Sequence, residues 1–129
     1  MDLNNHIQQI LTRHGGIRLA ILFGSLAKGR ATPESDLDLA VLMDVPLSAE
    51  TRIALIGELS QAMGRPVDLI DLRVSGEPIL GQILKYGVRL LGNDTDYAEL
   101  IKRHLFDEAD FMPLRRRILA ERRRAWIGT

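Results

Sequence analysis

The sequence predicts an α/β or α+β fold, in which helices flank a small mixed sheet within one domain. The chain has 129 residues, a length that supports one hydrophobic core and is short for two domains. Its composition, 46% hydrophobic and 26% charged, is typical of globular proteins. Short β-rich runs alternate with helical patterns along the chain, and this alternation predicts layers of helix and sheet.

The first predicted elements are a helix over 3–13 and a strand over 17–23. Apolar residues recur at helical spacing in the first segment, and a glycine pair at 15–16 ends it. The second segment is a short, continuous, β-rich apolar run. A single helical turn is then expected over 26–28, stopped by Gly29.

The second strand is predicted over 36–43, because residue types there alternate with a period of two. Leucine, valine and methionine side chains take one face. The opposite face carries Asp36, Asp38 and Ala40. A strand face with two acids is electrostatically costly unless water or cations neutralise it.

The second half of the chain continues the alternation. Ser48 is the predicted N-cap of the next helix, and Gly64 and Pro66 are stop signals after it. A break or kink is expected at Pro113. The predicted elements are a helix to about residue 63, a strand over 67–72, a helix over 78–86, a strand over 88–91 and a helix over 95–124.

Charge is balanced overall but divided along the chain. Residues 113–129 carry six arginines and one glutamate, a net charge of +5, so residues 1–112 carry −5. A solvated helix face is the ordinary explanation of the arginine runs. Docking of this tail onto an acidic partner surface, or onto RNA, is the functional alternative.

The chain has no cysteine, which excludes disulfides, thiolate zinc sites and cysteine nucleophiles. A reducing cytoplasm is consistent with this composition. Apolar runs such as 19–23 are far too short to span a bilayer, and the first residues lack a signal-peptide pattern. We therefore expect a cytoplasmic protein without a membrane partner.

A glycine-serine turn after the first strand is the first half of a candidate site. Gly24 permits close approach of the backbone to a ligand, and the N–H groups after it open a helical turn that favours an anion. The Ser25 hydroxyl and the Lys28 ammonium add donors for phosphate. This turn is therefore expected to bind the phosphates of a nucleoside triphosphate.

Paired carboxylates on the second strand form the other half. Asp36 and Asp38 point to the same face, with Cα atoms roughly 6–7 Å apart, so both can bind Mg²⁺. Two such ions would clamp the attacking and leaving oxygens of a phosphoryl displacement. A third carboxylate is expected from the strand over 67–72, where Asp68 is preferred and Asp71 is the alternative.

The Gly-Ser pair, ten residues and then Asp-x-Asp resemble the signature of the DNA polymerase β-like nucleotidyltransferases. Within that superfamily the chain is most similar to the minimal nucleotidyltransferase antitoxins of MNT–HEPN toxin–antitoxin modules. The run from Gly64 to Leu72 also resembles the third-strand segment of that group. The likeness covers roughly 15–92. It implies a nucleotidyltransferase core over 1–92 and a helical, arginine-rich extension of the same domain over 93–129.

The resemblance also implies roles for individual residues. Gly24 and Ser25 would hold the triphosphate, and Asp36 and Asp38 would bind two Mg²⁺ ions. Asp68 would complete the metal site and help to activate the acceptor hydroxyl. Lys28 stands where the family usually has arginine, which keeps the charge but loses bidentate phosphate contact.

By the same resemblance, the chain would transfer AMP from ATP to a tyrosine of a partner HEPN ribonuclease and silence that toxin in a hetero-oligomer. A small-molecule nucleotidyltransferase of the antibiotic-modifying kind is one alternative. A non-catalytic antitoxin that acts by binding alone is another. The residues themselves predict metal-dependent nucleotidyl transfer and do not identify the acceptor or the base.

Overall fold

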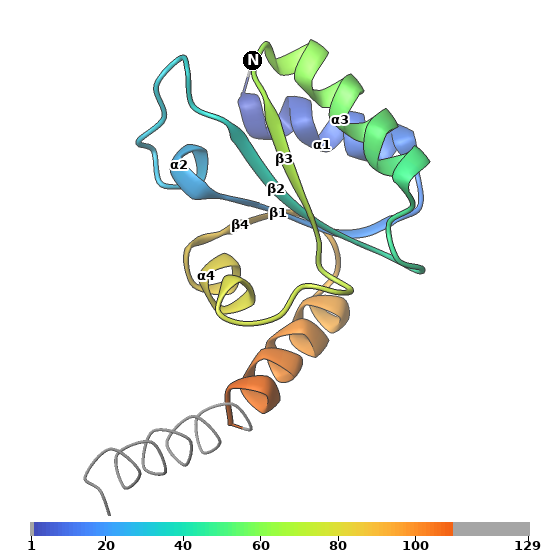
Figure 1. Cartoon of the computed structure of the whole chain (residues 1–129), viewed down its shortest axis with the longest axis vertical. Coiled ribbons are helices and arrows are strands. Elements are labelled where there is room, and N and C mark those ends of the chain that lie inside the picture. The colour runs from blue at the N-terminus through green and yellow to red at the C-terminus, as the bar shows by residue number, and fades with distance from the viewer. Residues whose placement is uncertain (1, 110–129) are drawn as a thin grey trace, which may run out of the picture.

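A computed structural model describes residues 2–109 of the chain as a four-stranded sheet with helices on both faces (Figure 1). A further helix, without a label in Figure 1, covers residues 94–109. The labelled elements are α1 Leu3–His14, β1 Ile17–Phe23, α2 Gly24–Ala27, β2 Leu37–Met43, α3 Ala49–Met63, β3 Val67–Asp71, α4 Ile79–Tyr86 and β4 Val88–Leu91.

The predicted elements are all present in the described part of the chain, with small shifts of their ends. The short turn is the clearest difference, because α2 begins at Gly24 itself rather than at residue 26. The last helix begins at residue 94. Its predicted end at residue 124, the break at Pro113 and the arginine-rich segment lie outside the described residues.

The sheet is mixed, as the sequence predicts. Its strand order is β3-β2-β1-β4. Strand β1 is antiparallel to both of its neighbours, whereas β2 and β3 run parallel. The helix α3 makes the crossover between the parallel strands. As a result, the start of β2, the start of β3 and the end of β1 lie at the same end of the sheet.

Helices α1 and α3 cover one face of the sheet (Figure 1). The Ser48 hydroxyl accepts from the Thr51 N–H at 3.1 Å and so caps the start of α3. Leu55 and Leu59 on this helix are fully buried. They pack with the predicted apolar face of β2, whose side chains Leu37, Leu39 and Val41 are also fully buried.

Helix α4 and the helix over 94–109 cover the other face (Figure 1). Ala40 of β2 is fully buried there with Leu80, Ile83 and Leu100. The face that carries the acids is therefore polar only at the start of β2 and belongs to a second hydrophobic core further along. None of the helices in the described residues is long and apolar enough to cross a membrane.

Candidate functional site

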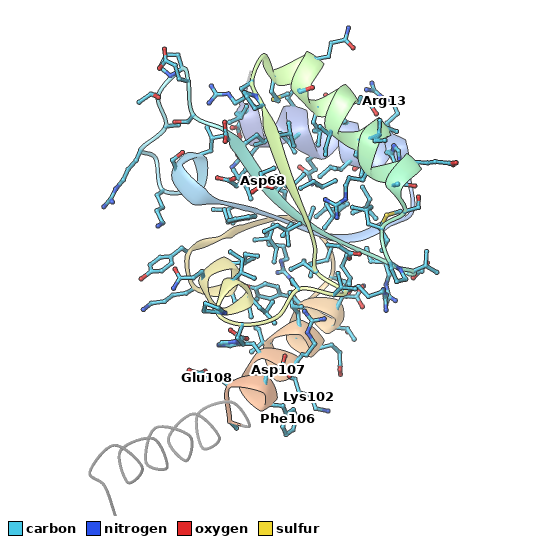
Figure 2. All side chains as sticks on the ribbon, in the orientation of Figure 1. Arg13, Asp68, Lys102, Phe106, Asp107 and Glu108 are labelled. Atoms are coloured by element: carbon cyan, nitrogen blue, oxygen red, sulfur yellow. The ribbon has the colours of Figure 1, made fainter. Side chains whose placement is uncertain are left out.

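The predicted site residues meet at the end of the sheet that faces α2. Asp38 on β2 pairs with Phe23, the last residue of β1, and on its other side with Asp68 on β3. Figure 2 marks Asp68 at this end of the sheet. Gly24 follows Phe23 directly, so two segments far apart in the sequence and one turn converge on Asp38.

Two neighbouring carboxylates act on Asp38 at this end. Asp36 and Asp68 are exposed, whereas Asp38 is partly buried. Burial raises the pKa of Asp38, and the negative charges of Asp68 and Asp36 raise it further. The ionised form of Asp38 is therefore held at a cost that a bound cation would relieve.

Gly24 leaves the space that the Asp38 carboxylate occupies. Its φ is +73°, in the left-handed region that favours glycine. A Cβ atom at this position would collide with Oδ2 of Asp38. The glycine turn and the acidic strand are thus one interlocked unit, and the turn reaches the acid only because residue 24 has no side chain.

The rest of the turn presents donors beside the acids. Within the described residues, no side chain caps the start of α2, so its first backbone N–H groups point outward without a side-chain acceptor. Ser25 lies in this turn and is partly buried. Lys28 follows the turn, exposed, with its Nζ 4.8 Å from the ring centroid of Tyr86 at the end of α4.

Asp71 lies at the other end of β3 and has a structural role. Its side chain is buried. Its carboxylate oxygens accept from the backbone N–H of Leu47 at 2.8 Å and of Arg73 at 3.0 Å. Asp71 therefore ties the loop before α3 to the end of β3. Of the two candidates for a third carboxylate, the structure places Asp68, and not Asp71, beside Asp38.

Two further residues support the site and were missed by the sequence analysis. The guanidinium of Arg65 donates to the backbone oxygen of Ser35 at 3.0 Å and to that of Thr32 at 3.3 Å. It thereby holds the loop that leads into Asp36. Tyr86 is the second, through its contact with Lys28. Arg65 directly follows the predicted stop signal Gly64, so its place beside a turn was visible in the sequence. Nothing local in the sequence pairs Tyr86 with residue 28.

The donor set fits a hard divalent cation. Carboxylate oxygens are the ligands that such ions prefer, and the charges of Asp68 and Asp36 reach Asp38 and raise its pKa. No three acidic or histidine side chains among residues 2–109 already stand at coordination spacing. A cation would thus draw these carboxylates together rather than enter a preformed coordination site.

Comparisons with known proteins agree on one family. The family model for polymerase beta nucleotidyltransferases matches residues 5–96. The protein adenylyltransferase MntA of Shewanella oneidensis is 35% identical over 80 residues, which cover 62% of this chain. The matched region spans only 58% of that relative's own length.

Solved structures extend the likeness over nearly the whole chain. A toxin–antitoxin crystal structure with AMP-PNP matches with a TM-score of 0.82 and 27% identity, covering 93% of this chain and 98% of the other. A second match is the complex of tri-AMPylated HEPN toxin with MNT antitoxin from Shewanella oneidensis. Its TM-score is 0.75 at 26% identity, over 92% of this chain and 93% of that one.

Proposed function

The chain belongs to the polymerase beta nucleotidyltransferase family, and from this premise we propose that it transfers AMP from ATP to a tyrosine hydroxyl of a HEPN-type protein. By this modification it would act as the antitoxin of that partner. The observation that carries the proposal is the position of Asp38, which lies beside Asp68 and against Gly24 and is acted on by the charge of Asp36. The relatives support AMP as the transferred group and a protein as the acceptor, since one is a protein adenylyltransferase and another is bound to an AMPylated toxin.

In this proposal the α2 turn binds the triphosphate. The backbone N–H groups after Gly24 and the Ser25 hydroxyl donate to phosphate oxygens. Lys28 contributes a mobile point charge, because its ammonium rests over an aromatic ring and has no carboxylate partner within the described residues. A lysine can leave such a contact at a cost of only about 1 kcal/mol.

The three carboxylates would hold Mg²⁺. A bound Mg²⁺ ion neutralises the negative charge that develops on the phosphate oxygens. Asp38 lies on β2 and Asp36 directly precedes that strand, which begins at Leu37 rather than at the predicted residue 36, and both would contribute ligand oxygens. Asp68 approaches from the neighbouring strand, and because it is exposed it can also meet an incoming hydroxyl group.

The reaction balances without a further reactant. The phenolic oxygen of the acceptor attacks the α-phosphorus of ATP and forms a phosphodiester bond. The bond between the α-phosphorus and the bridging oxygen breaks, and pyrophosphate leaves with its electron pair. Asp68 receives the phenolic proton and passes it to solvent. Positioning of the reactants supplies much of the rate enhancement.

The proposal extends to location and organisation. We place the protein in the cytoplasm, where ATP is available. We assign catalysis to residues 1–92 and partner contact to the extension over 93–129. The family match over 5–96 is compatible with a boundary near residue 92.

The test is nucleotide transfer by the purified chain. The chain is incubated with Mg²⁺, α-labelled ATP and a lysate of its own host, and labelled protein is identified by mass spectrometry. The Asp36→Asn/Asp38→Asn variant should give no labelled band. Asp44→Asn is the matched control, because it removes an exposed acid from the far end of β2, and it should label normally.

The remaining outcomes separate the alternatives. Labelled small molecules without labelled protein would indicate an antibiotic-modifying type of enzyme. Neutralisation of a toxic partner by the Asp36→Asn/Asp38→Asn variant would indicate an antitoxin that acts by contact alone. Parallel reactions with GTP, CTP and UTP would show which base is accepted.

A further inference from the structure

A cavity of about 490 Å³ lies at the end of the sheet opposite the acids. It is formed by the start of β1, the end of β2, the segment after β3 and the helix over 94–109. Leu42 in its wall is four residues along β2 from Asp38, which is about 13 Å in a strand. The cavity is therefore distinct from the candidate catalytic site.

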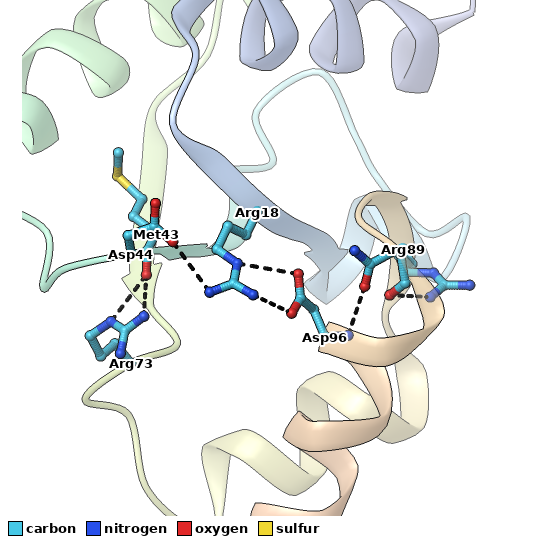
Figure 3. A network of polar contacts seen from close by, with 7 residues as sticks. Arg18, Met43, Asp44, Arg73, Arg89 and Asp96 are labelled. Carbon is cyan, nitrogen blue, oxygen red and sulfur yellow. Dashed lines mark hydrogen bonds and ion pairs between the residues drawn. The ribbon is translucent and has the colours of Figure 1, made fainter.

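The lining of this cavity is predominantly cationic. Four basic side chains line it: Arg18, Arg73, Lys102 and Arg103. Only Arg18 has acidic partners within the described residues. It contacts Asp96 at 2.6 Å and Asp44 at 3.2 Å (Figure 3).

The other three cations have no carboxylate within 4 Å among residues 2–109. Glu99 is the one further acidic residue in the described lining. The cavity thus keeps an excess of positive charge that nothing in this part of the chain neutralises.

Two of these arginines are fixed in place before any ligand arrives. The guanidinium of Arg73 donates to the Met43 backbone oxygen, with Nε at 3.0 Å (Figure 3). That of Arg103 donates to the backbone oxygens of Leu72 at 2.5 Å and Ser75 at 3.3 Å. The Nε of Arg103 is buried and has no hydrogen-bond partner among residues 2–109. Binding here would therefore cost little side-chain entropy.

An exposed aromatic ring borders the cationic lining. Phe106 is 60% exposed, and the Nζ of Lys102 lies 6.0 Å from its ring centroid. Figure 2 shows both side chains on the same side of the helix. Leu105 on this helix and Val74 in the segment that Arg103 contacts are also largely exposed. Aromatic and arginine side chains together are typical of protein interfaces.

We infer that this cavity and its Phe106 border dock an acidic segment of the protein partner, one that presents carboxylates together with an apolar or aromatic side chain. The inference rests on the proposed function, since it supposes that the chain acts on a protein. Charge argues for an acidic segment, because three of the four lining cations lack a carboxylate partner among residues 2–109. The exposed apolar border argues for a polypeptide rather than a small anion.

The arrangement also orients the partner. The acid-rich end repels an acidic surface while the cationic cavity attracts it, so an acidic partner approaches with its negative segment toward residues 99–106. The docked segment is then held away from the Asp36, Asp38 and Asp68 carboxylates, and another part of the partner is left to reach them.

Binding of a fluorescein-labelled glutamate–tyrosine random copolymer tests the inference. The full chain should raise its fluorescence anisotropy, and the affinity should fall with salt. The Lys102→Glu/Phe106→Ser variant should bind about tenfold or more weakly. Both positions are exposed, so the fold should survive, which circular dichroism and Tm would check.

The matched control makes the same kinds of change on the α1/α3 face. Arg13→Glu/Ile53→Ser reverses an exposed charge and removes an exposed apolar side chain there, and it should bind within about twofold of the wild type. Equal binding by the Lys102→Glu/Phe106→Ser variant would overturn the inference. Displacement of the copolymer by micromolar pyrophosphate, or tighter binding of a single-stranded RNA at this site, would also overturn it.

The outcome is separable from that of the proposed function. The Asp36→Asn/Asp38→Asn variant should bind the copolymer at least as tightly as the wild type does, because its substitutions lie at the other end of the sheet and remove only repulsive charge. Loss of nucleotide transfer with copolymer binding retained would fault the proposed chemistry and leave the docking site standing. Nucleotide transfer with no copolymer binding would overturn the docking site and leave the proposed chemistry standing.

Discussion

The two ends of the sheet hold like charges in opposite ways. At the α2 end, the negative charges of Asp68 and Asp36 act on Asp38, and within the described residues the three acids have no cationic partner within 4 Å. At the other end, Arg73 and Arg103 are bonded to backbone oxygens, while Arg18 is paired with Asp96. At the acidic end the fold keeps like charges close despite their repulsion, whereas at the basic end hydrogen bonds and an ion pair hold the arginine side chains in place.

This difference separates function from stability. Groups whose native environment opposes their charged state are frequent at functional sites. Groups whose hydrogen bonds are satisfied within the fold contribute to its stability instead. We expect substitutions at the acidic end to remove nucleotide transfer while sparing the fold. Substitutions of the bonded or ion-paired groups at the basic end should lower stability and leave the chemical step unchanged.

The largest expected effect is on activity, and it should distinguish Asp68 from Asp71, two aspartates of β3. Asp68→Asn should lower the rate of AMP transfer about 1000-fold, since it removes a metal ligand and a proton acceptor. Its Tm should stay near that of the wild type, because Asp68 is exposed. Single-turnover rates with labelled ATP and a thermal melt would measure both.

Asp71→Asn is the comparison for Asp68→Asn. It weakens two bonds from backbone N–H groups in a buried setting and should cost about 2 kcal/mol of unfolding free energy. The rate of the folded fraction should be nearly unchanged. A stable Asp71→Asn protein without activity would contradict the assignment of Asp68.

Two glycines with similar backbone angles offer the next contrast. Gly24→Ala should reduce AMP transfer about 100-fold, because the new Cβ displaces the Asp38 carboxylate. Gly29→Ala shares the strain of a positive φ, +70° against +73°, but its Cβ meets nothing within 4 Å. It should cost about 1 kcal/mol of stability and little activity. Equal losses of activity in the two variants would show that strain, rather than collision, is responsible.

The Arg18–Asp96 ion pair at the basic end should respond in stability rather than in the chemical step. Asp96→Asn weakens the two bonds that Arg18 donates to a carboxylate only 11% exposed. It should cost about 1 kcal/mol, read from urea unfolding, with AMP transfer within twofold of the wild type. Asp94→Asn is the control, since its carboxylate is 97% exposed in the pair with Arg89. A measurable cost there would argue against the role of burial.

The smallest effect is a gain of stability at the acidic end. Burial, then the charges of Asp68 and Asp36, raise the pKa of Asp38. The ionised acid therefore destabilises the metal-free protein at neutral pH, and the penalty vanishes as pH falls through that raised pKa. Asp38→Asn should raise Tm by about 2 °C at pH 7, as expected for relief of roughly half a kcal/mol in a partly solvated site.

Thermal melts of this variant and the wild type without divalent cations, from pH 7 to pH 4, would measure that gain. The gap in Tm should close on acidification, because protonation removes the same charge from the wild type. A gap that is constant or widens toward low pH would contradict the sign of the pKa shift.

Local patterns predicted most of the fold. The bounds of the strands at Ile17–Phe23 and Val88–Leu91 follow from short apolar runs between glycines. The acids at 36 and 38 and the turn at 24 follow from spacing within one hairpin-like segment. These features depend on neighbours in the sequence, which is why a single sequence is enough to find them.

Other features depend on contacts between distant segments. The choice between Asp68 and Asp71 rests on the register of β3 against β2 and on a bond to Leu47. The Arg65 contact with residues 32–35 spans thirty residues or more. The burial of Ala40 depends on helices that follow it by some forty residues. Sequence spacing carries no information on such partners until the sheet order is known.

The contact between Gly24 and Asp38 has a consequence for the history of this fold. The two positions, fourteen residues apart, are coupled, because any side chain at position 24 displaces the carboxylate at position 38. A descendant that abandons catalysis is freed from both constraints at once. Among sequences of this fold, a residue other than glycine at position 24 should therefore accompany loss of the acid at position 38. The two positions together would distinguish inactive homologues from active ones.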